Sequence, residues 1–181
     1  MTSFSHVSQV AVPRDLLLKL KVKTIAELPT FSKITLHTST TQAINQSTHI
    51  LSPFLTLMLI SGQTPQLTRA KKPVAAFRLR KDSLLGCKVT LRGQRMLSML
   101  EMLSQVVLPR LRDFSGFTPK SVNVQGKFSY GLSTTLIFQE LEALYDVVDL
   151  SSGVELSLHC DSSSPMYAQL LISAFQFPFH S

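Results

Sequence analysis

The residues best placed to do chemistry in this chain are cations between residues 61 and 93. Eight Arg and Lys side chains fall in this segment, with Asp82 as its single acid. The eight are Arg69, Lys71, Lys72, Arg78, Arg80, Lys81, Lys88 and Arg92. Cations that no acid neutralises attract phosphate, and here they alternate with apolar residues as in a strand. The segment therefore predicts a folded surface that binds nucleic acid.

The charge distribution over the rest of the chain supports this interpretation. The 181 residues carry a formal net charge of +7, yet no Lys or Arg occurs from Phe128 to the C-terminus. Because the whole basic excess precedes that point, we expect an electrically two-sided molecule. We also expect RNA binding to come from the first two thirds of the chain.

Residue types that could carry catalysis or bind a metal are too scattered to do so. His37, His159 and Asp161 have no nucleophile or paired carboxylate beside them in the sequence, so we interpret them as structural. Cys87 and Cys160 lack partners at metal-ligand spacing and fall in strand-like runs, which favours buried, reduced thiols. We predict no catalytic residue, no metal site and no cofactor.

Patterning along the chain predicts the elements that position the cations. The expected helices span residues 13–23, 40–60 and 94–108, and a last helix begins around Pro165 after a cap at residues 161–164. The expected strands span residues 31–38, 74–80, 86–92, 132–138 and 154–160. This order predicts one α+β domain over residues 1–181, with a mostly antiparallel sheet and helices packed on one face.

Two neighbouring strands are expected to form a protruding basic β-hairpin with residues 81–85 as its turn. In the first strand Phe77 would face inward, and Arg78 and Arg80 outward. In the second, Lys88, Thr90 and Arg92 would face outward. Because no aromatic side chain would then be free to stack on bases, we expect recognition of RNA backbone and shape rather than of single-stranded sequence.

The composition argues for a packed domain that does not enter a membrane. Hydrophobic residues make up 44% of the chain, and no apolar run reaches the length of a membrane span. Residues 1–9 are expected to form a flexible N-terminal arm. They lack the arginines of a mitochondrial presequence and the apolar run of a secretory signal.

Several ordered blocks of the chain resemble one protein family. They are Thr68-Arg69-Ala70-Lys71-Lys72, Phe77-Arg78-Leu79-Arg80, Gly86-Cys87-Lys88-Val89-Thr90-Leu91-Arg92-Gly93, Leu108-Pro109-Arg110-Leu111-Arg112-Asp113-Phe114-Ser115-Gly116 and Ala174-Phe175-Gln176-Phe177-Pro178-Phe179. In this order and spacing they resemble the bacterial-type large-subunit ribosomal protein five, over essentially the whole chain from about Val10.

The resemblance implies partners and site residues. Members of that family bind 5S rRNA and large-subunit rRNA in the central protuberance, beside neighbouring central-protuberance proteins. Their hairpin reaches the P-site tRNA and a small-subunit head protein. For rRNA binding the resemblance implies Lys33, Gln63 and Thr90, and the charge pattern of the segment adds Arg69, Lys71, Lys72, Lys88 and Arg92. His37, at a position where the family has an asparagine, completes the expected rRNA-binding set. At the tRNA and the intersubunit bridge the resemblance implies Arg80, Lys81, Asp82 and Ser83, to which the charge pattern adds Arg78.

The chain departs from the family pattern in two polar elements. His37 and Ser39-Thr40-Thr41 stand where the family has an asparagine and a glycine-valine-glycine turn. Val122-Asn123-Val124-Gln125-Gly126 replaces a phenylalanine-aspartate-glycine-arginine-glycine loop. These drifted contacts favour a mitochondrial ribosome over a plastid one or a bacterial cytoplasm. A free-standing RNA chaperone or translation regulator that uses the same basic face is the alternative function.

Overall fold

The structure is a computed structural model of the chain. It describes residues 10–20, 22, 24–44, 46–112, 114–143, 153–162 and 164–180, so the arm predicted at residues 1–9 lies outside the described residues. The chain divides into two compact units. Unit 1 comprises Met1–Ile34, Leu91–Tyr130 and Ser157–Ser181, and unit 2 comprises Thr35–Thr90 and Gly131–Leu156.

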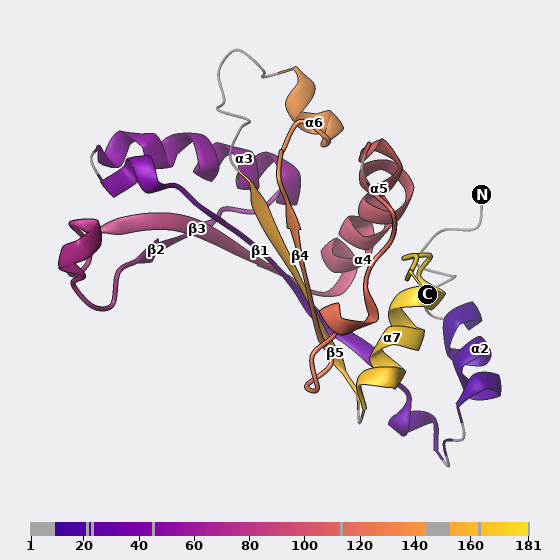
Figure 1. The fold of residues 1–181 in the computed structure, drawn as a ribbon. Helices are drawn as coiled ribbons and strands as arrows, with labels where there is room; N and C mark the ends of the chain where they lie inside the picture. Colours follow the sequence, from indigo (N-terminus) through magenta and orange to yellow (C-terminus); the bar gives the residue numbers. More distant parts are fainter. Residues whose placement is uncertain are drawn as a thin grey trace. The chain divides into compact units, whose positions relative to one another are not determined.

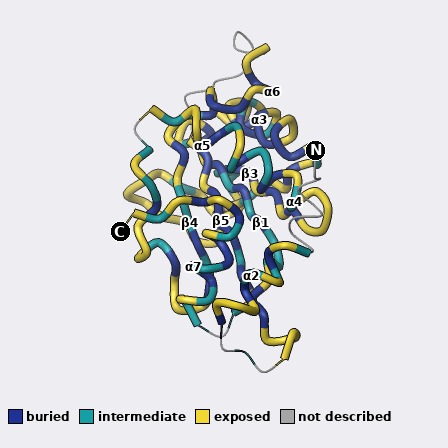
Figure 2. The backbone as a smooth tube through the Cα atoms, turned by 90° about the vertical axis from the view of Figure 1, so that its right-hand side faces the viewer, coloured by how far each residue is buried: buried dark blue, intermediate teal, exposed yellow. Residues whose placement is uncertain are grey.

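A five-stranded antiparallel sheet underlies the fold (Figure 1). In spatial order its strands are β2 (Gln66–Arg69), β3 (Leu84–Leu91), β1 (Thr30–Ser39), β5 (Val154–Asp161) and β4 (Lys127–Leu132). The strands predicted at residues 31–38, 86–92 and 154–160 are confirmed with small shifts at their ends, as is the α+β class. Figure 2 shows buried residues recurring along β1 and β5, as expected for strands with one face against a core.

The basic hairpin is present, but its first strand differs from the prediction. β2, rather than residues 74–80, pairs with β3, in a register that places Gln66 opposite Lys88. β2 is short and mostly exposed, as edge strands often are. Its sequence contains too few apolar residues to stand out as a strand, and pairing with β3 supplies the order that the sequence pattern lacks.

The turn of the hairpin also lies elsewhere than predicted. Residues 70–83, called the basic loop below, connect β2 to β3. Within the loop, Val74 and Leu79 form an isolated bridge, and a 3₁₀ turn at Ala75–Phe77 reverses the chain. Arg78 closes this turn with a left-handed φ of 52°. No glycine marks the reversal, so the alternation of apolar and polar residues at 74–80 predicted a continuous strand instead.

The prediction of a strand at residues 132–138 is wrong. β4 lies earlier, mostly in a stretch predicted as loop. After it the chain makes a compact turn, in which the Phe138 N–H donates to the Thr135 carbonyl at 3.1 Å, and a short helix, α6 (Gln139–Glu142), follows. Phe138 is 0% exposed. Ile137 and Phe138 are therefore buried in a turn, whereas Leu136 is 43% exposed, and single-sequence patterning reads such a segment as a strand.

In unit 2 the predicted helix at residues 40–60 forms only in its second half. Two 3₁₀ turns, Thr41–Ile44 and Ser47–Ile50, precede α3 (Leu51–Ser61). Ser, Thr and Asn are frequent in the first half, and such side chains compete for backbone hydrogen bonds. Gly62 ends α3 with a left-handed φ of 60°, as predicted.

The remaining α-helices belong to unit 1, and the first of them ends at Lys19, earlier than the predicted end at residue 23. They are α2 (Val12–Lys19), α4 (Gly93–Met102) with its π-helical extension Leu103–Val107, α5 (Leu108–Arg110) and α7 (Pro165–Ala174). The α4 stripe of Met96 and Leu100 is buried. The helical segment runs one residue past Pro109, the predicted stop. Ser164 caps α7 by accepting the Tyr167 N–H at 3.4 Å.

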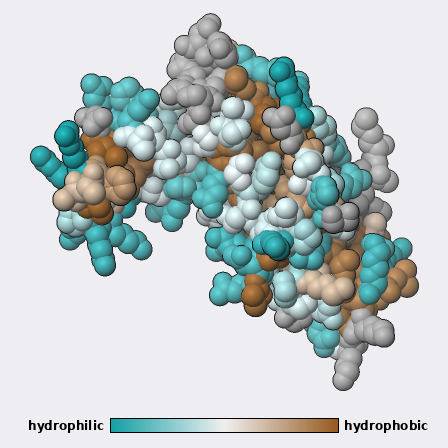
Figure 3. Space-filling view, viewed as in Figure 1, coloured by the Kyte–Doolittle hydropathy of each residue, from teal (hydrophilic) through white to brown (hydrophobic). Residues whose placement is uncertain are grey.

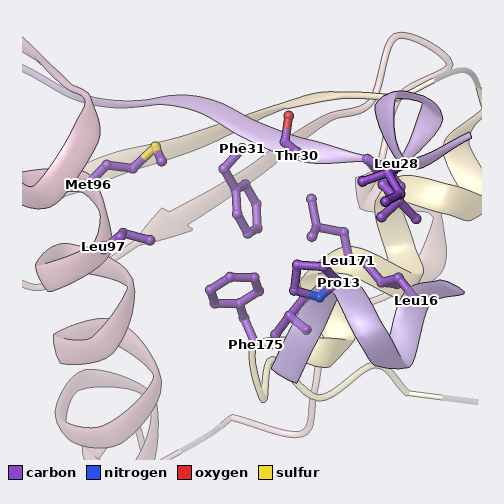
Figure 4. Close-up of a pocket in the computed structure, with 12 residues that line it drawn as sticks. Pro13, Leu16, Leu28, Thr30, Phe31, Met96, Leu97, Leu171 and Phe175 are labelled. Atoms are coloured by element: carbon purple, nitrogen blue, oxygen red, sulfur yellow. The ribbon is translucent and has the colours of Figure 1, made fainter. Parts of the chain in front are cut away.

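An aromatic cluster stabilises the core of unit 1. Phe117, 2% exposed, packs edge to face against Phe128, Tyr130 and Phe114 with ring centroids 4.8–4.9 Å apart. Unit 1 also contains a hollow of about 300 Å³ between α2, β1, α4 and α7 (Figure 4). Thr30 is the one lining residue with a polar side chain, so the hollow offers apolar surface and no reactive group.

Candidate nucleic-acid interface

The basic loop carries the densest group of cations in unit 2. Lys71, Lys72, Arg78, Arg80 and Lys81 are all exposed. Within the described part of the chain, none of the five forms an ion pair with a carboxylate. Their charge is therefore available to an anionic partner.

Backbone hydrogen bonds give the basic loop a defined shape. The Ala70 N–H donates to the Ser83 carbonyl at 2.9 Å, and the Asp82 N–H donates to the Ala70 carbonyl at 3.0 Å. The Ser83 hydroxyl donates to the Arg80 carbonyl at 2.8 Å, which closes a second turn. Asp82 adopts a φ of 64° and Arg78 a φ of 52°. A left-handed φ is uncommon outside glycine, so the surrounding hydrogen bonds must hold these two residues in place.

Phe77 adds an aromatic surface to the loop, against the prediction that it faces inward. It is 69% exposed, and Val74 is 39% exposed. Because Phe77 lies in a turn instead of a strand, no sheet face covers its ring. Figure 3 shows hydrophobic side chains beside hydrophilic ones at the end of the hairpin. Sequence reasoning missed this surface because it mislocated the turn.

The β3 side chains alternate as predicted. Cys87 and Val89 are 0% and 2% exposed, whereas Lys88 and Thr90 are exposed. β3 thus presents a charge and a hydroxyl on the face opposite the core. This pairing can hold a phosphate and a ribose hydroxyl of an RNA backbone.

His37 and Gln63, two further predicted contacts, differ in how they are held. The His37 Nδ1 lies 3.8 Å from the Glu155 Oε2, at side-chain exposures of 37% and 54%. A partner RNA would therefore meet a histidine–carboxylate pair at this point of β1 and β5. Gln63 is half-buried after α3, and its N–H donates to the Ser61 hydroxyl at 3.2 Å.

In unit 1 the structure brings Lys33 and Arg92 to one part of the sheet. Lys33 is half-buried on β1, and the Arg92 Nη1 donates to the carbonyl of Ser32, the preceding residue of β1, at 3.2 Å. Lys127 and His159 lie on the neighbouring strands β4 and β5. Sequence reasoning missed these two, because Lys127 was assigned to a loop and His159 was interpreted as structural.

The two cysteines are confirmed as buried free thiols. Burial raises the pKa of Cys87, and burial together with the nearby Asp161 carboxylate raises the pKa of Cys160 to about 12. Both groups are therefore protonated at neutral pH, which makes them poor nucleophiles and poor metal ligands. Across the described ranges no three metal-ligating side chains cluster, and no helix is long and apolar enough to cross a membrane.

Comparison with known families matches the chain along most of its length. Residues 25–80 match the family described as ribosomal protein L5, and residues 84–179 match the model of that family's C-terminus. The first match contains β2 and the second contains β3, so the two together take in both strands of the hairpin. The family assignment therefore covers most of the basic loop and the whole sheet.

Full-length bacterial relatives support the same assignment. A protein of Buchnera aphidicola subsp. Schizaphis graminum named large ribosomal subunit protein uL5 is 35% identical over 99% of both chains. Proteins of the same name from Polynucleobacter asymbioticus and Bordetella pertussis are each 36% identical, over 99% and 100% of both chains. Identity at this level over complete chains shows common family membership.

Proposed function

The chain belongs to the ribosomal protein L5 family, and on that premise we propose that it is a non-enzymatic structural protein of the large ribosomal subunit that binds rRNA. One observation carries the rRNA-binding part of the proposal. β3 buries Cys87 and Val89 on one face while Lys88 and Thr90 are exposed on the other. The cations of the basic loop, which pair with no carboxylate among the described residues, continue from the same hairpin.

The proposed rRNA contacts divide between strands and loop. On the strands they are Lys33, His37, Arg69, Lys88 and Thr90, with Arg92 directly after β3, Gln63 before β2, and Lys71 and Lys72 in the loop. We propose a 5S-type rRNA as the main partner, with large-subunit rRNA beside it. Side chains on strands of a sheet have fixed spacing, which suits the regular phosphates of a helical RNA.

The turns of the basic loop are proposed to contact other partners. Arg78, Arg80, Lys81, Asp82 and Ser83 lie in or beside its two tight turns. Exposed loops on a rigid scaffold commonly carry binding function. We assign this part to the P-site tRNA and to a protein of the small-subunit head, and other exposed surfaces to neighbouring central-protuberance proteins.

We further propose that the ribosome in question is mitochondrial. The support is the departure of His37 and of residues 39–41 and 122–126 from the pattern of the family that the sequence resembles. Co-purification of the tagged protein with mitochondrial large subunits would support the assignment. Recovery with plastid or cytosolic ribosomes only would refute it.

The salt dependence of 5S rRNA binding tests the proposed function. If about five phosphates are neutralised, the logarithm of the affinity for a bacterial 5S rRNA transcript falls with log salt at a slope of about −4. Filter binding over a range of KCl concentrations measures this slope. A slope near zero, or no binding at low salt, would contradict the proposal. Charge changes at Glu140 or Glu142, on α6, serve as the control and leave the slope unchanged.

A further inference from the structure

A second cationic group lies apart from the basic loop in the sequence, on the part of the sheet that belongs to unit 1. It consists of Arg92, Lys33, His159 and Lys127, called the sheet-end cluster below. Arg92 directly follows β3, and the other three lie on β1, β5 and β4. The spatial order of these strands is β3-β1-β5-β4, so each member belongs to a strand beside the next.

The members of the cluster share one face of the sheet. On β1, β5 and β4 the residues next to them, Ile34, Leu158 and Phe128, are each 0% exposed and therefore point into the core. Successive side chains of a strand point to opposite faces. The cluster is therefore on the face turned away from that core, where a partner can reach it.

Hydrogen bonds fix the Arg92 side of the cluster. The Arg92 Nη1 donates to the Ser32 carbonyl at 3.2 Å. The Ser32 hydroxyl in turn donates to the His159 carbonyl at 3.2 Å. Lys33 follows Ser32 on β1, the strand between β3 and the β5 segment that carries His159.

Contacts on both sides of Lys127 fix the part of the sheet-end cluster that lies on β4 and β5. The Cys160 N–H donates to the Gly126 carbonyl at 3.2 Å. Two residues further along β4, the hydroxyls of Ser129 and Ser157 lie 3.3 Å apart. These two contacts bracket Lys127 and His159 on adjacent strands and leave two hydroxyl groups next to them.

The charges around His159 show that no described acid near the sheet-end cluster cancels its positive charge. Burial lowers the pKa of His159, and the nearby charges of Lys33, Lys127 and Arg92 lower it further. Among the described groups that act on it, the Asp161 carboxylate alone raises the pKa, and it does not reverse the effect. The imidazole is therefore neutral at neutral pH in the free protein, within a local excess of positive charge.

We propose that the sheet-end cluster binds a phosphodiester of RNA and that His159 takes up a proton from solvent when the phosphate binds. Arg92, Lys33 and Lys127 supply charge on three strands or strand ends, and the half-buried Ser129 hydroxyl can donate a hydrogen bond, whereas Ser157 beside it is buried. The phosphate keeps its single negative charge, and the imidazole becomes a cation that pairs with it. The proposal rests on the proposed rRNA binding and extends it toward β4 and β5.

The direction of the pH effect follows from linkage. The phosphate adds negative charge beside His159, so the pKa in the complex lies above that in the free protein. Binding therefore takes up protons between these two pKa values, and affinity rises as pH falls through that window. A rise of one pKa unit corresponds to about a tenfold gain in affinity at the low-pH end.

Affinity measurements with a bacterial 5S rRNA transcript test the proposal. Wild-type affinity is expected to rise about three- to tenfold between about pH 7.5 and about pH 5.5, beyond any rise seen with His159→Gln. Titration of the RNA itself cancels in this difference. His49→Gln, an exposed histidine in unit 2 outside the proposed sites, is the control and keeps the wild-type profile.

The contribution of Lys127 is read from the salt slope. Lys127→Ala is expected to lower the magnitude of the slope by about 0.7–0.9, the loss of one phosphate contact. Lys120→Ala removes the same charge at an exposed site whose neighbour Pro119 accepts a hydrogen bond from Gln169 of α7, and it leaves the slope unchanged. A Lys127 variant that behaves like the Lys120 control would overturn the proposal.

Calorimetry measures the proton uptake directly. Wild-type protein titrated with the same transcript at about pH 6.5, in two buffers of different ionisation enthalpy, is expected to show net proton uptake. Zero uptake, with binding intact, refutes the histidine step while leaving the rRNA-binding function standing. Absence of any RNA binding refutes both. Uptake that persists in a folded His159→Gln variant also refutes this assignment.

Discussion

The basic loop and the sheet-end cluster both gather positive charge, but the fold holds them in different ways. The loop is exposed along most of its length, and two of its residues, Arg78 and Asp82, adopt left-handed φ. The cluster stands on strands whose other faces are packed, with Ile34, Leu158 and Phe128 each 0% exposed. Charges on packed strands keep a fixed spacing, whereas charges on the loop depend on two tight turns. The cluster therefore suits a rigid RNA helix, and the loop suits a partner that binds exposed turns.

The largest expected effect comes from removing the ring of Phe117, which packs against Phe128, the neighbour of Lys127 in the sheet-end cluster. Phe117→Ala deletes the centre of the aromatic cluster of unit 1 and should lower the free energy of unfolding by about 3–5 kcal/mol. Urea denaturation followed by circular dichroism measures it. Phe77→Ala in the basic loop removes the same ring from an exposed site, 69% accessible, and should cost no more than about 0.5 kcal/mol. Equal losses in the two variants would erase the distinction between the regions.

A methyl group at Gly86 should have the next largest effect, where the hairpin meets the sheet. A Cβ at Gly86 would collide with the Thr38 carbonyl and lie 2.9 Å from the Ser39 Cα. Both obstacles are backbone, so β1 and β3 must separate locally. Gly86→Ala should destabilise unit 2 by about 1–3 kcal/mol. Gly131→Ala, where nothing lies within 4 Å, is the control. No difference between the two melting temperatures would show that the strands adapt freely.

The sequence was sufficient to predict the elements whose buried residues recur with a regular period. Buried positions on β3 follow a period-two pattern and those on α4 a helical one, so the faces of these two elements were assigned correctly. Lys88, Thr90 and Arg92 were placed on the exposed face for the same reason. For β1 and β5 the sequence located the strands. Where burial and periodicity agree, the pattern alone locates an element and its outward side chains.

The sequence failed where local geometry overrides periodicity. The turn at residues 75–78 contains no glycine, and Arg78 adopts the left-handed φ instead. The sequence therefore contains no indication of a turn there. β4 begins in a polar stretch, and the tertiary pairing that makes it a strand is invisible to single-sequence reasoning. Lys127 and His159 were missed for that reason, because their proximity depends on strand pairing between segments distant in the sequence.

The smallest expected effect concerns the stability of the basic loop. Replacing Arg80 and Lys81 by Ala should change the free energy of unfolding by no more than about 0.5 kcal/mol, since both side chains are exposed and unpaired with described carboxylates. The same variant should slow subunit association or weaken P-site tRNA binding. Thermal melts and sucrose-gradient joining assays measure the two. A large loss of stability with normal subunit joining would reverse the assignment of the loop.

The central claim is that the strand residues bind 5S rRNA and the basic loop binds other partners. Its most direct test compares 5S rRNA affinity between two charge-matched variants. One carries Lys33→Ala and Arg92→Ala on the strands, and the other carries Arg80→Ala and Lys81→Ala in the loop. Each removes two positive charges, so a nonspecific electrostatic effect is the same in both. We predict that the strand variant loses affinity by about tenfold or more and that the loop variant stays within about twofold of wild type. Equal losses, or a larger loss in the loop variant, would contradict the account.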